Sequence, residues 1–276
     1  MNIIVQKFGG TSVSTEERRK QVINKIGKAI ESGLKPVVVV SAMGRMGEAY
    51  ATDTLLSLVD NNFKDNNKKA QDLLMCCGEI ISSVVLCNDL YKHGITAVPL
   101  TGGQAGIITN DVHTDAQAID VDTHNIMKII EEGKVPVVTG FQGVTKDGFF
   151  TTLGRGGSDT SACILGVALK AKQIDIYTDV NKNVIFKSGG ILEGLSSRTQ
   201  KEVQKRVQEM QFTYIKLSEK NNVLVIPVTN NISSCTFAVI VKSNEEINEK
   251  DTYIVRNLLT AYEFTLVDYA LRSVSN

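Results

Sequence analysis

Residues 36–42 read PVVVVSA, a short run of β-branched residues in which neighbouring positions are apolar. Side chains of a strand alternate between the two faces of a sheet, so this run is apolar on both faces and is typical of a strand in the middle of a covered sheet. Similar runs recur at 2–6, 95–100, 135–141, 174–179, 223–228 and 236–241. The sequence therefore predicts a central sheet buried between other layers.

Helical patterns lie between several of these runs. Ser14 and Glu17 have the spacing of a capping box at the start of residues 14–33. The apolar side of that helix is formed by Val22, Ile23, Ile26 and Ile30. Further helices are expected at about 69–92 and 123–133. Because helices and strands alternate, the predicted fold class is α/β, a three-layer sandwich with a mainly parallel central sheet between helices.

The charge balance limits the partners of the chain. Its 276 residues include 30 Lys and Arg and 30 Asp and Glu, and the sequence pI is about 6.8. Without a net positive field, binding to nucleic acid or to an anionic membrane surface is not expected. The N-terminal MNIIVQKFGG has an apolar run too short for a signal peptide, and no stretch approaches the ~20 apolar residues that span a bilayer. A soluble, cytoplasmic protein is therefore predicted.

Cysteine and histidine give no sign of a metal site. The five cysteines lack any CxxC spacing. The histidines His93, His113 and His124 lie apart in polar surroundings. Buried free thiols are the expected state of the cysteines, and no residue is assigned as a metal ligand.

The stretch GRGGSDTSA, residues 154–162, follows a predicted hairpin turn at 146–148 and precedes an apolar run. Its glycines can bring backbone N–H groups close to a ligand, and a helix that begins at Ser158 or Asp159 adds the positive end of its dipole. Arg155 adds a fork that fits a carboxylate or a phosphate. The stretch predicts an anion site; the alternative is a tight strand-to-helix connection capped by Ser158.

A second glycine loop, KFGGTS at 7–12, follows the first predicted strand. It places Lys7 beside Gly9 and Gly10, so backbone donors and an ammonium group could meet an anion there. The alternative is an ordinary turn with a surface lysine. Two such loops in one chain favour a polyanionic ligand, although neither has the GxxxxGK[ST] pattern of a Walker loop.

Three further polar features are candidates. Glu79 lies inside a strongly apolar helix, where a buried charge needs a partner or a ligand; the alternative is a carboxylate that reaches solvent. Thr52 and Asp53 precede a short apolar run, where helix capping is the alternative to a ligand contact. Thr178 and Asp179 end a predicted strand, the edge at which open α/β sheets bind ligands, unless they only form a turn.

Several segments of the chain occur in an order that points to one family. They are VQKFGGTSV, VVVVSAMGRMGEAYATDTLLSL, CGEIISS, LTGGQAGIITND, VVTGFQG, TTLGRGGSDTSA and IYTDV. Over roughly residues 1–180 the chain resembles the catalytic domain of bacterial aspartate kinases, in the amino acid kinase superfamily. The resemblance is to the aspartokinases of the diaminopimelate and dipicolinate branch.

The resemblance implies an ATP-dependent kinase with Mg²⁺ as a cofactor. Such an enzyme transfers the γ-phosphoryl group of ATP to the side-chain carboxylate of L-aspartate, giving 4-phospho-L-aspartate for lysine biosynthesis. The substrate carboxylate is ionised at pH 7, with a reference pKa of ~3.9, so no general base is needed. Catalysis would rest on positioning and on positive charge.

The resemblance also implies roles for individual residues. Lys7 and Asp159 would be catalytic, with Asp159 orienting Lys7 or a Mg²⁺-bound phosphate. The substrate would contact Arg155 through its α-carboxylate and Glu79 through its ammonium group. Further substrate positions would be Thr52, Gly156, Gly157 and Ser158. Nucleotide positions would be Lys7, Phe8, Gly9, Gly10, Ser41, Thr178 and Asp179.

The chain departs from the family pattern after residue 180. NVIFKSGG and EMQFTYIK stand where the family has nucleotide-contacting segments, and Gln211 occupies the position of a phosphate-binding lysine. Lys187 or Lys216 could take over that role. The expected domains are 1–242, a kinase domain whose nucleotide-binding part begins at about 150, and a tail at 243–276 that resembles a truncated first element of an ACT domain.

Two functions are therefore considered. The first is an active aspartate kinase without the family's ACT domains, as a homodimer or in association with a full-length aspartokinase. The second is a catalytically weak or inactive homologue that binds an amino acid or nucleotide as a regulatory subunit. The presence of Lys7, Glu79, Arg155 and Asp159 favours the first.

Overall fold

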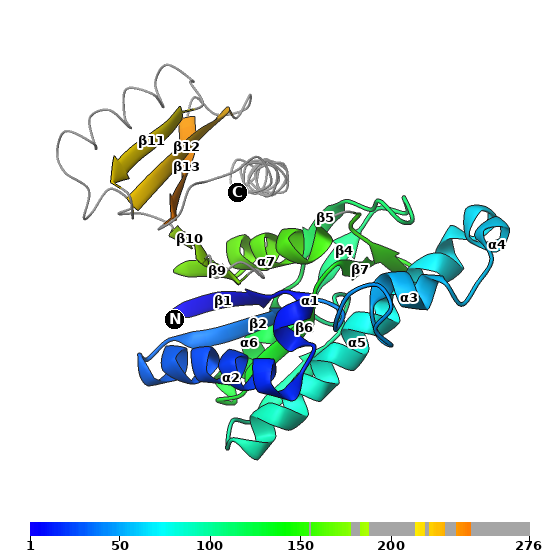
Figure 1. Ribbon diagram of the computed structural model, residues 1–276, viewed down its shortest axis with the longest axis horizontal. Helices are drawn as coiled ribbons and strands as arrows, with labels where there is room; N and C mark the ends of the chain where they lie inside the picture. Colours follow the sequence, from blue (N-terminus) through cyan, green and yellow to red (C-terminus); the bar gives the residue numbers. More distant parts are fainter. Residues whose placement is uncertain (155, 178–182, 188–212, 219–220, 230–235, 244–276) are drawn as a thin grey trace.

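A computed structural model of the chain describes residues 1–154 and 156–177, together with the strands at 183–187, 213–218, 221–229 and 236–243. Its main feature is a six-stranded sheet in the order β10-β9-β1-β2-β6-β3 (Figure 1). The strands are β1 (Ile3–Phe8), β2 (Lys35–Val40), β3 (Ala97–Leu100), β6 (Val135–Thr139), β9 (Gln173–Tyr177) and β10 (Asn183–Lys187). All neighbouring pairs are parallel except β10 with β9, which confirms the mainly parallel sheet.

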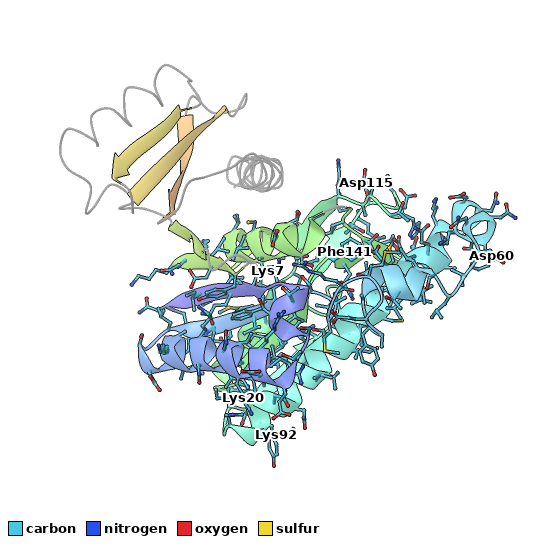
Figure 2. The ribbon with its side chains drawn as sticks, in the orientation of Figure 1. Lys7, Lys20, Asp60, Lys92, Asp115 and Phe141 are labelled. Carbon is cyan, nitrogen blue, oxygen red and sulfur yellow. The ribbon has the colours of Figure 1, made fainter. Side chains whose placement is uncertain are left out.

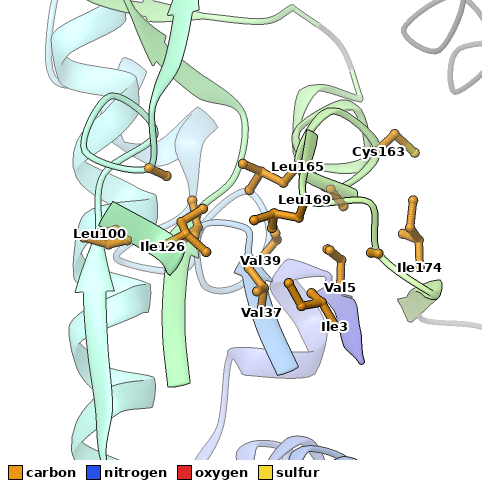
Figure 3. Packing of buried hydrophobic residues seen from close by; sticks show 14 of the residues in the cluster. Ile3, Val5, Val37, Val39, Leu100, Ile126, Cys163, Leu165, Leu169 and Ile174 are labelled. Carbon is orange, nitrogen blue, oxygen red and sulfur yellow. The ribbon is translucent and has the colours of Figure 1, made fainter. Parts of the chain in front are cut away.

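Helices cover both faces of this sheet. On one face α6 (His124–Glu131) and α7 (Gly157–Ala168) pack on Val37 and Val39; on the other, α2 (Glu16–Glu31) and α5 (Lys68–Lys92) pack on Val38 and Val40. Figure 3 shows the first of these cores, where side chains of β1 and β2 meet those of α7. Alternating β-branched side chains thus fill two apolar layers, and the three-layer α/β fold is confirmed.

The helix α2 differs in detail from its prediction. Its N-cap is Thr15, whose hydroxyl accepts a hydrogen bond from the N–H of Arg18 at 3.3 Å. Ser14 instead ends the short helix α1 (Gly10–Val13), donating its hydroxyl to the carbonyl of Thr11. Ile30, in the last turn, is 41% exposed, because a helix end has neighbours on fewer sides than its middle. The capping box and the inward position of Ile30 were wrong predictions.

A second sheet, in the order β5-β4-β7-β8, lies beside the N-terminal half of α5. Its strands are β4 (Ile107–Thr109), β5 (Ala118–Val121), β7 (Gln142–Val144) and β8 (Phe150–Thr152). The predicted turn at 146–148 is confirmed: it joins β7 to β8 in an antiparallel hairpin, in which Gly148 donates to the carbonyl of Thr145. Two short helices, α3 (Thr52–Leu56) and α4 (Asn61–Asn66), precede α5.

The runs at 223–228 and 236–241 form strands, but not in the central sheet. They lie in β12 (Asn221–Thr229) and β13 (Thr236–Ser243), which pair antiparallel with β11 (Thr213–Ser218) in a separate three-stranded sheet. An apolar run predicts a strand but not the sheet that it joins. Ser243, the first residue of the predicted tail, is the last residue of β13. Gln211 and residues 244–276 of the tail lie outside the described residues.

The helix α5 is long and apolar enough to cross a membrane by length and composition, contrary to the expectation that no stretch comes near this limit. It nevertheless carries buried carboxylates at Asp72, Glu79 and Asp89 that contact protein groups, such as the 2.7 Å ion pair of Asp89 with Arg19. Polar groups are buried in this way where a helix packs inside a protein. In this structure α5 is a core helix.

Candidate active site

A cavity of about 430 Å³ opens where the parallel strands β1, β2 and β6 reach their carboxyl ends. Open α/β sheets bind ligands at this edge. The wall brings together ten of the residues that the sequence singled out: Lys7, Gly10, Ser41, Thr52, Asp53, Glu79, Gly156, Gly157, Ser158 and Asp159. Residues from distant parts of the chain therefore meet in one place.

Lys7 and Asp159 form a largely buried ion pair in this cavity, in which the side chain of Asp159 is 17% exposed. The strand β1 continues through Lys7 to Phe8, so Lys7 is a strand residue, not a loop residue, and only 7% of it is exposed. Its Nζ lies 2.6 Å from Oδ1 of Asp159, in the first turn of α7. The alternative prediction, that Lys7 is a surface lysine, is therefore wrong. A cation and an anion held this close out of water point to a site for a further charged ligand.

The helix α7 begins earlier than predicted. Its N-cap is Gly156, with φ of 79°, and the helix starts at Gly157. Ser158 is therefore inside the helix and does not cap it. A left-handed N-cap favours glycine because it has no Cβ. The first turn of a twelve-residue helix, with its positive dipole end, then forms part of the cavity wall.

Glu79 faces the same cavity from α5. It is 2% exposed, and its Oε1 accepts a hydrogen bond from the N–H of Ala42 at 3.1 Å. Its Oε2 is buried without a hydrogen-bond partner among the described residues. Burial raises the pKa of Glu79 from 4.5 to about 8, although the hydrogen bond from Ala42 opposes this shift. The solvent-facing alternative was wrong; the unpaired oxygen is suited to a cationic group.

A close approach of the loop 41–51 to α5 places Ala42 on Glu79. A Cβ on Gly78 would lie 2.8 Å from Cβ of Ala42 and 3.0 Å from the carbonyl oxygen of Tyr50. Only glycine at this position lets the loop lie so near the helix. The short helix α3 follows with Ala51 as its N-cap, so Thr52 and Asp53 belong to its first turn and are not caps.

Gly78→Ala is expected to displace this loop, to destabilise the fold by ~1–3 kcal/mol, and to weaken any ligand held by Glu79. Gly27→Ala in α2 is the matched control, because nothing lies within 4 Å of its added Cβ. This control should stabilise the protein by ~0.5–1 kcal/mol, the usual gain for Gly to Ala in a helix. Thermal unfolding of both variants checks the contrast, and equal shifts in Tm would contradict it.

The remaining predicted residues are placed elsewhere. The Phe8 ring is buried and stacks on Tyr177, with centroids 4.7 Å apart, and the N–H of Gly9 donates to the carbonyl of Tyr177 at 3.3 Å. Neither contributes to the cavity wall. Their nucleotide role stays a prediction. Three of the predicted site residues lie outside the described residues: Arg155, Thr178 and Asp179.

Phe141 lines the cavity but was not predicted from the sequence. It follows β6 with φ of 71°, a left-handed backbone that is rare for an aromatic residue. Its N–H donates to the hydroxyl of Ser161 and its carbonyl accepts from Leu153, which hold this backbone in place. Figure 2 labels Phe141 and Lys7 near one another at the carboxyl edge of the sheet. Its signal in the sequence was the strand end VVTGF. Arg45 and Gly154 also line the wall.

Comparison with known proteins identifies related sequences. A sequence model described as the amino acid kinase family matches residues 2–182. Aspartokinase 1 of Bacillus subtilis (strain 168) is 52% identical over 180 residues, which are 65% of this chain and 45% of that protein. Aspartokinase of Geobacillus stearothermophilus is 47% identical over 180 residues, which are 65% of this chain and 43% of that protein. The match thus spans less than half the length of these relatives.

Solved structures give the same fold. The aspartate kinase from Synechocystis is 40% identical with a TM-score of 0.51, over 64% of this chain and 28% of that one. Aspartokinase III of E. coli, in complex with aspartate and ADP, is 23% identical with a TM-score of 0.51, over 65% of this chain and 49% of that one. The second likeness concerns the fold alone.

Proposed function

The chain belongs to the amino acid kinase family, and from this premise we propose that it transfers the γ-phosphoryl group of ATP to the side-chain carboxylate of L-aspartate, giving 4-phospho-L-aspartate. One observation carries the proposal. A buried lysine–aspartate pair and a buried, half-satisfied carboxylate line a single cavity at the carboxyl edge of a parallel sheet. The relatives named aspartokinase support the choice of aspartate as acceptor.

The proposed reaction requires positive charge near the phosphates and does not require a general base. The substrate carboxylate, with a reference pKa of ~3.9, is already ionised. Its oxygen forms a bond to the γ-phosphorus while the bond from this phosphorus to the β,γ-bridging oxygen breaks, and ADP leaves with those electrons. Two anions must approach each other, so the Lys7 ammonium would offset the negative charge that gathers on the transferred group.

Glu79 would receive the ammonium group of the amino acid. Its Oε2 lies buried without a partner in the described part of the chain, and an ammonium group offers three donors. The α-carboxylate would bind at the start of α7, near Gly157 and Ser158, where helix N–H groups and the dipole favour an anion. By resemblance, Arg155 would complete this contact.

The triphosphate would bind near Lys7 and Gly10. A Cβ on Gly10 would collide with the carbonyl oxygen of Ala42, so glycine keeps this turn tight against the loop after β2. Mg²⁺ typically binds phosphate oxygens together with one or two carboxylates, and Asp159 beside Lys7 fits that donor set. The ion would neutralise phosphate charge. Asp159 itself would keep Lys7 aligned on the phosphates.

The test is an acyl-phosphate assay. Purified protein with Mg²⁺-ATP and L-aspartate should give a product that hydroxylamine traps as a hydroxamate. Asp159→Asn should lower the rate about 10²-fold, because it removes the group that aligns Lys7. Wild-type product no greater than that of the variant would contradict the proposal. Calorimetric binding of aspartate without turnover would then favour the regulatory-subunit alternative.

A cytoplasmic location and assembly as a homodimer, or with a full-length aspartokinase, remain predictions. Size-exclusion chromatography of the purified chain, alone and with such a partner, would test the assembly.

A further inference from the structure

Asp72 is another of the buried carboxylates on α5, and the proposed reaction gives it no role. It is 0% exposed, yet its oxygens accept hydrogen bonds from three residues. Nδ1 of His113 lies 2.7 Å from Oδ2, the hydroxyl of Thr152 lies 2.6 Å from Oδ1, and the N–H of Thr114 lies 3.1 Å from both oxygens. Since a carboxylate only accepts, Nδ1 of His113 carries the proton.

These donors come from two separate segments. His113 and Thr114 belong to the loop 110–117 between β4 and β5, whereas Thr152 is the last residue of β8. The loop holds Thr114 at φ of 73°, a costly backbone for a β-branched residue. It is also closed onto β8 by the hydrogen bond from Ala116 to the carbonyl of Thr152 at 2.8 Å. Asp72 therefore fastens a strained loop and the end of a strand to one helix.

The fastened segments reach the cavity at Gly154. This residue follows Thr152 closely in the chain, lines the cavity and has φ of 71°. A Cβ on Gly154 would collide with Oδ1 of Asp115, a residue of this loop that Figure 2 labels. Leu153, between Thr152 and Gly154 in the chain, donates its N–H to the carbonyl of Phe141, another wall residue. A shift of the loop or of Thr152 would move this wall.

Both sides of the amino-acid pocket thus depend on α5. Glu79 faces the pocket directly from this helix, and Asp72, further toward its N-terminus, holds the wall at Gly154 through Thr152 and the loop. The α-helix is rigid, so the two carboxylates keep a constant separation along it. The wall that Asp72 holds also contacts the start of α7, since Gly157 donates its N–H to the carbonyl of Gly154 at 3.1 Å.

We propose that Asp72 is a positioning residue for the amino-acid substrate, acting through Thr152 and His113 on the wall at Gly154. This inference rests on the proposed function. In this proposal, the contacts of Asp72 keep the pocket between Glu79 and α7 at a size that fits a short amino dicarboxylic acid. A loosened wall would weaken binding of the amino acid and leave the nucleotide end, at Lys7, unchanged.

Neighbouring threonines provide a matched test. Thr151 and Thr152 are both 0% exposed, and each hydroxyl makes a buried hydrogen bond: Thr152 to Asp72 at 2.6 Å, and Thr151 to the Thr109 hydroxyl at 2.7 Å. Thr152→Val should raise the KM for L-aspartate about tenfold and leave the KM for ATP within about twofold. Thr151→Val should leave both KM values within about twofold, although both variants lower Tm. Thr152→Ser, which keeps the hydroxyl, should restore the KM for aspartate.

His113→Asn tests the same contact from the loop and should also raise the KM for L-aspartate selectively. Equal KM changes in Thr152→Val and Thr151→Val, or a change spread over both substrates, would overturn the positioning role while the proposed function stands. Absence of phosphoryl transfer by the wild-type protein would overturn the proposed function, and the positioning role with it.

Discussion

Lys7→Met should lower kcat by about 10³ at saturating ATP and L-aspartate, the largest effect expected of a single side chain in this site. The substitution keeps the length of the side chain but removes the cation 2.6 Å from Asp159. Removal of one preorganised charge from a dry site typically costs 10²–10³ in rate. The unpaired Asp159 would add electrostatic repulsion of the phosphates. Steady-state kinetics in the presence of Mg²⁺ measure this effect.

An exposed lysine–carboxylate pair provides the control. Lys20 and Glu16 on α2 lie 3.4 Å apart with side chains 57% and 69% exposed, so Lys20→Met should leave kcat unchanged. The double variant Lys7→Met with Asp159→Asn should recover stability, because it removes the uncompensated buried charge, but not activity. Recovery of activity in the double variant would show that Lys7 serves only to neutralise Asp159.

Glu79→Gln should abolish the pH dependence of aspartate binding and weaken this binding most at pH 8. Burial raises the pKa of Glu79 to about 8, so below this pH the empty site holds mostly the neutral acid. The ammonium group needs the carboxylate, so the KM of the wild type should fall about tenfold per pH unit from pH 6 to pH 8. In the variant KM should stay high and flat. A sloping profile in the variant would assign the titration to another group.

The same variant makes a prediction for the ligand-free protein. The folded pKa of Glu79 lies above its ordinary value of 4.5, so its contribution to stability is complete below that value and is lost as pH rises through about 8. Wild-type protein should therefore lose Tm relative to Glu79→Gln between pH 6 and pH 9. The loss corresponds to a few kcal/mol. If the Tm of wild type and of Glu79→Gln changed in parallel over this pH range, Glu79 would not be a buried carboxylate with an unpaired oxygen.

The central sheet could be predicted because its signal is local. Runs such as 36–42 and 135–141 contain their own evidence of double-sided burial, and the spacing of Ile126, Ile129 and Ile130 fixes the inner side of α6. The β12 and β13 runs have the same local signal, yet they join another sheet. Sheet membership depends on contacts between distant segments, which no run of residues specifies.

The site was predictable in composition and less so in geometry. Lys7 and Glu79 could be chosen from their glycine-rich or apolar surroundings, and Asp159 from the family resemblance. The burial of Glu79 depends on a loop that closes over Gly78, and the backbone of Phe141 depends on hydrogen bonds to Ser161 and Leu153. Asp72 was not predicted as a site residue, because its contacts come from His113, Thr114 and Thr152, far away in the chain. Such features arise only when segments far apart in the chain meet.

The central claim is that one cavity binds ATP beside an amino acid whose ammonium group is bound by Glu79. Its most direct test compares L-aspartate with succinate, which has the same two carboxylates but no ammonium group, as acceptors in the hydroxylamine-trapping assay with Mg²⁺-ATP. The account predicts ready hydroxamate formation from L-aspartate and at least about 10²-fold less from succinate. Equal yields from the two acids, or no product from L-aspartate, would contradict it.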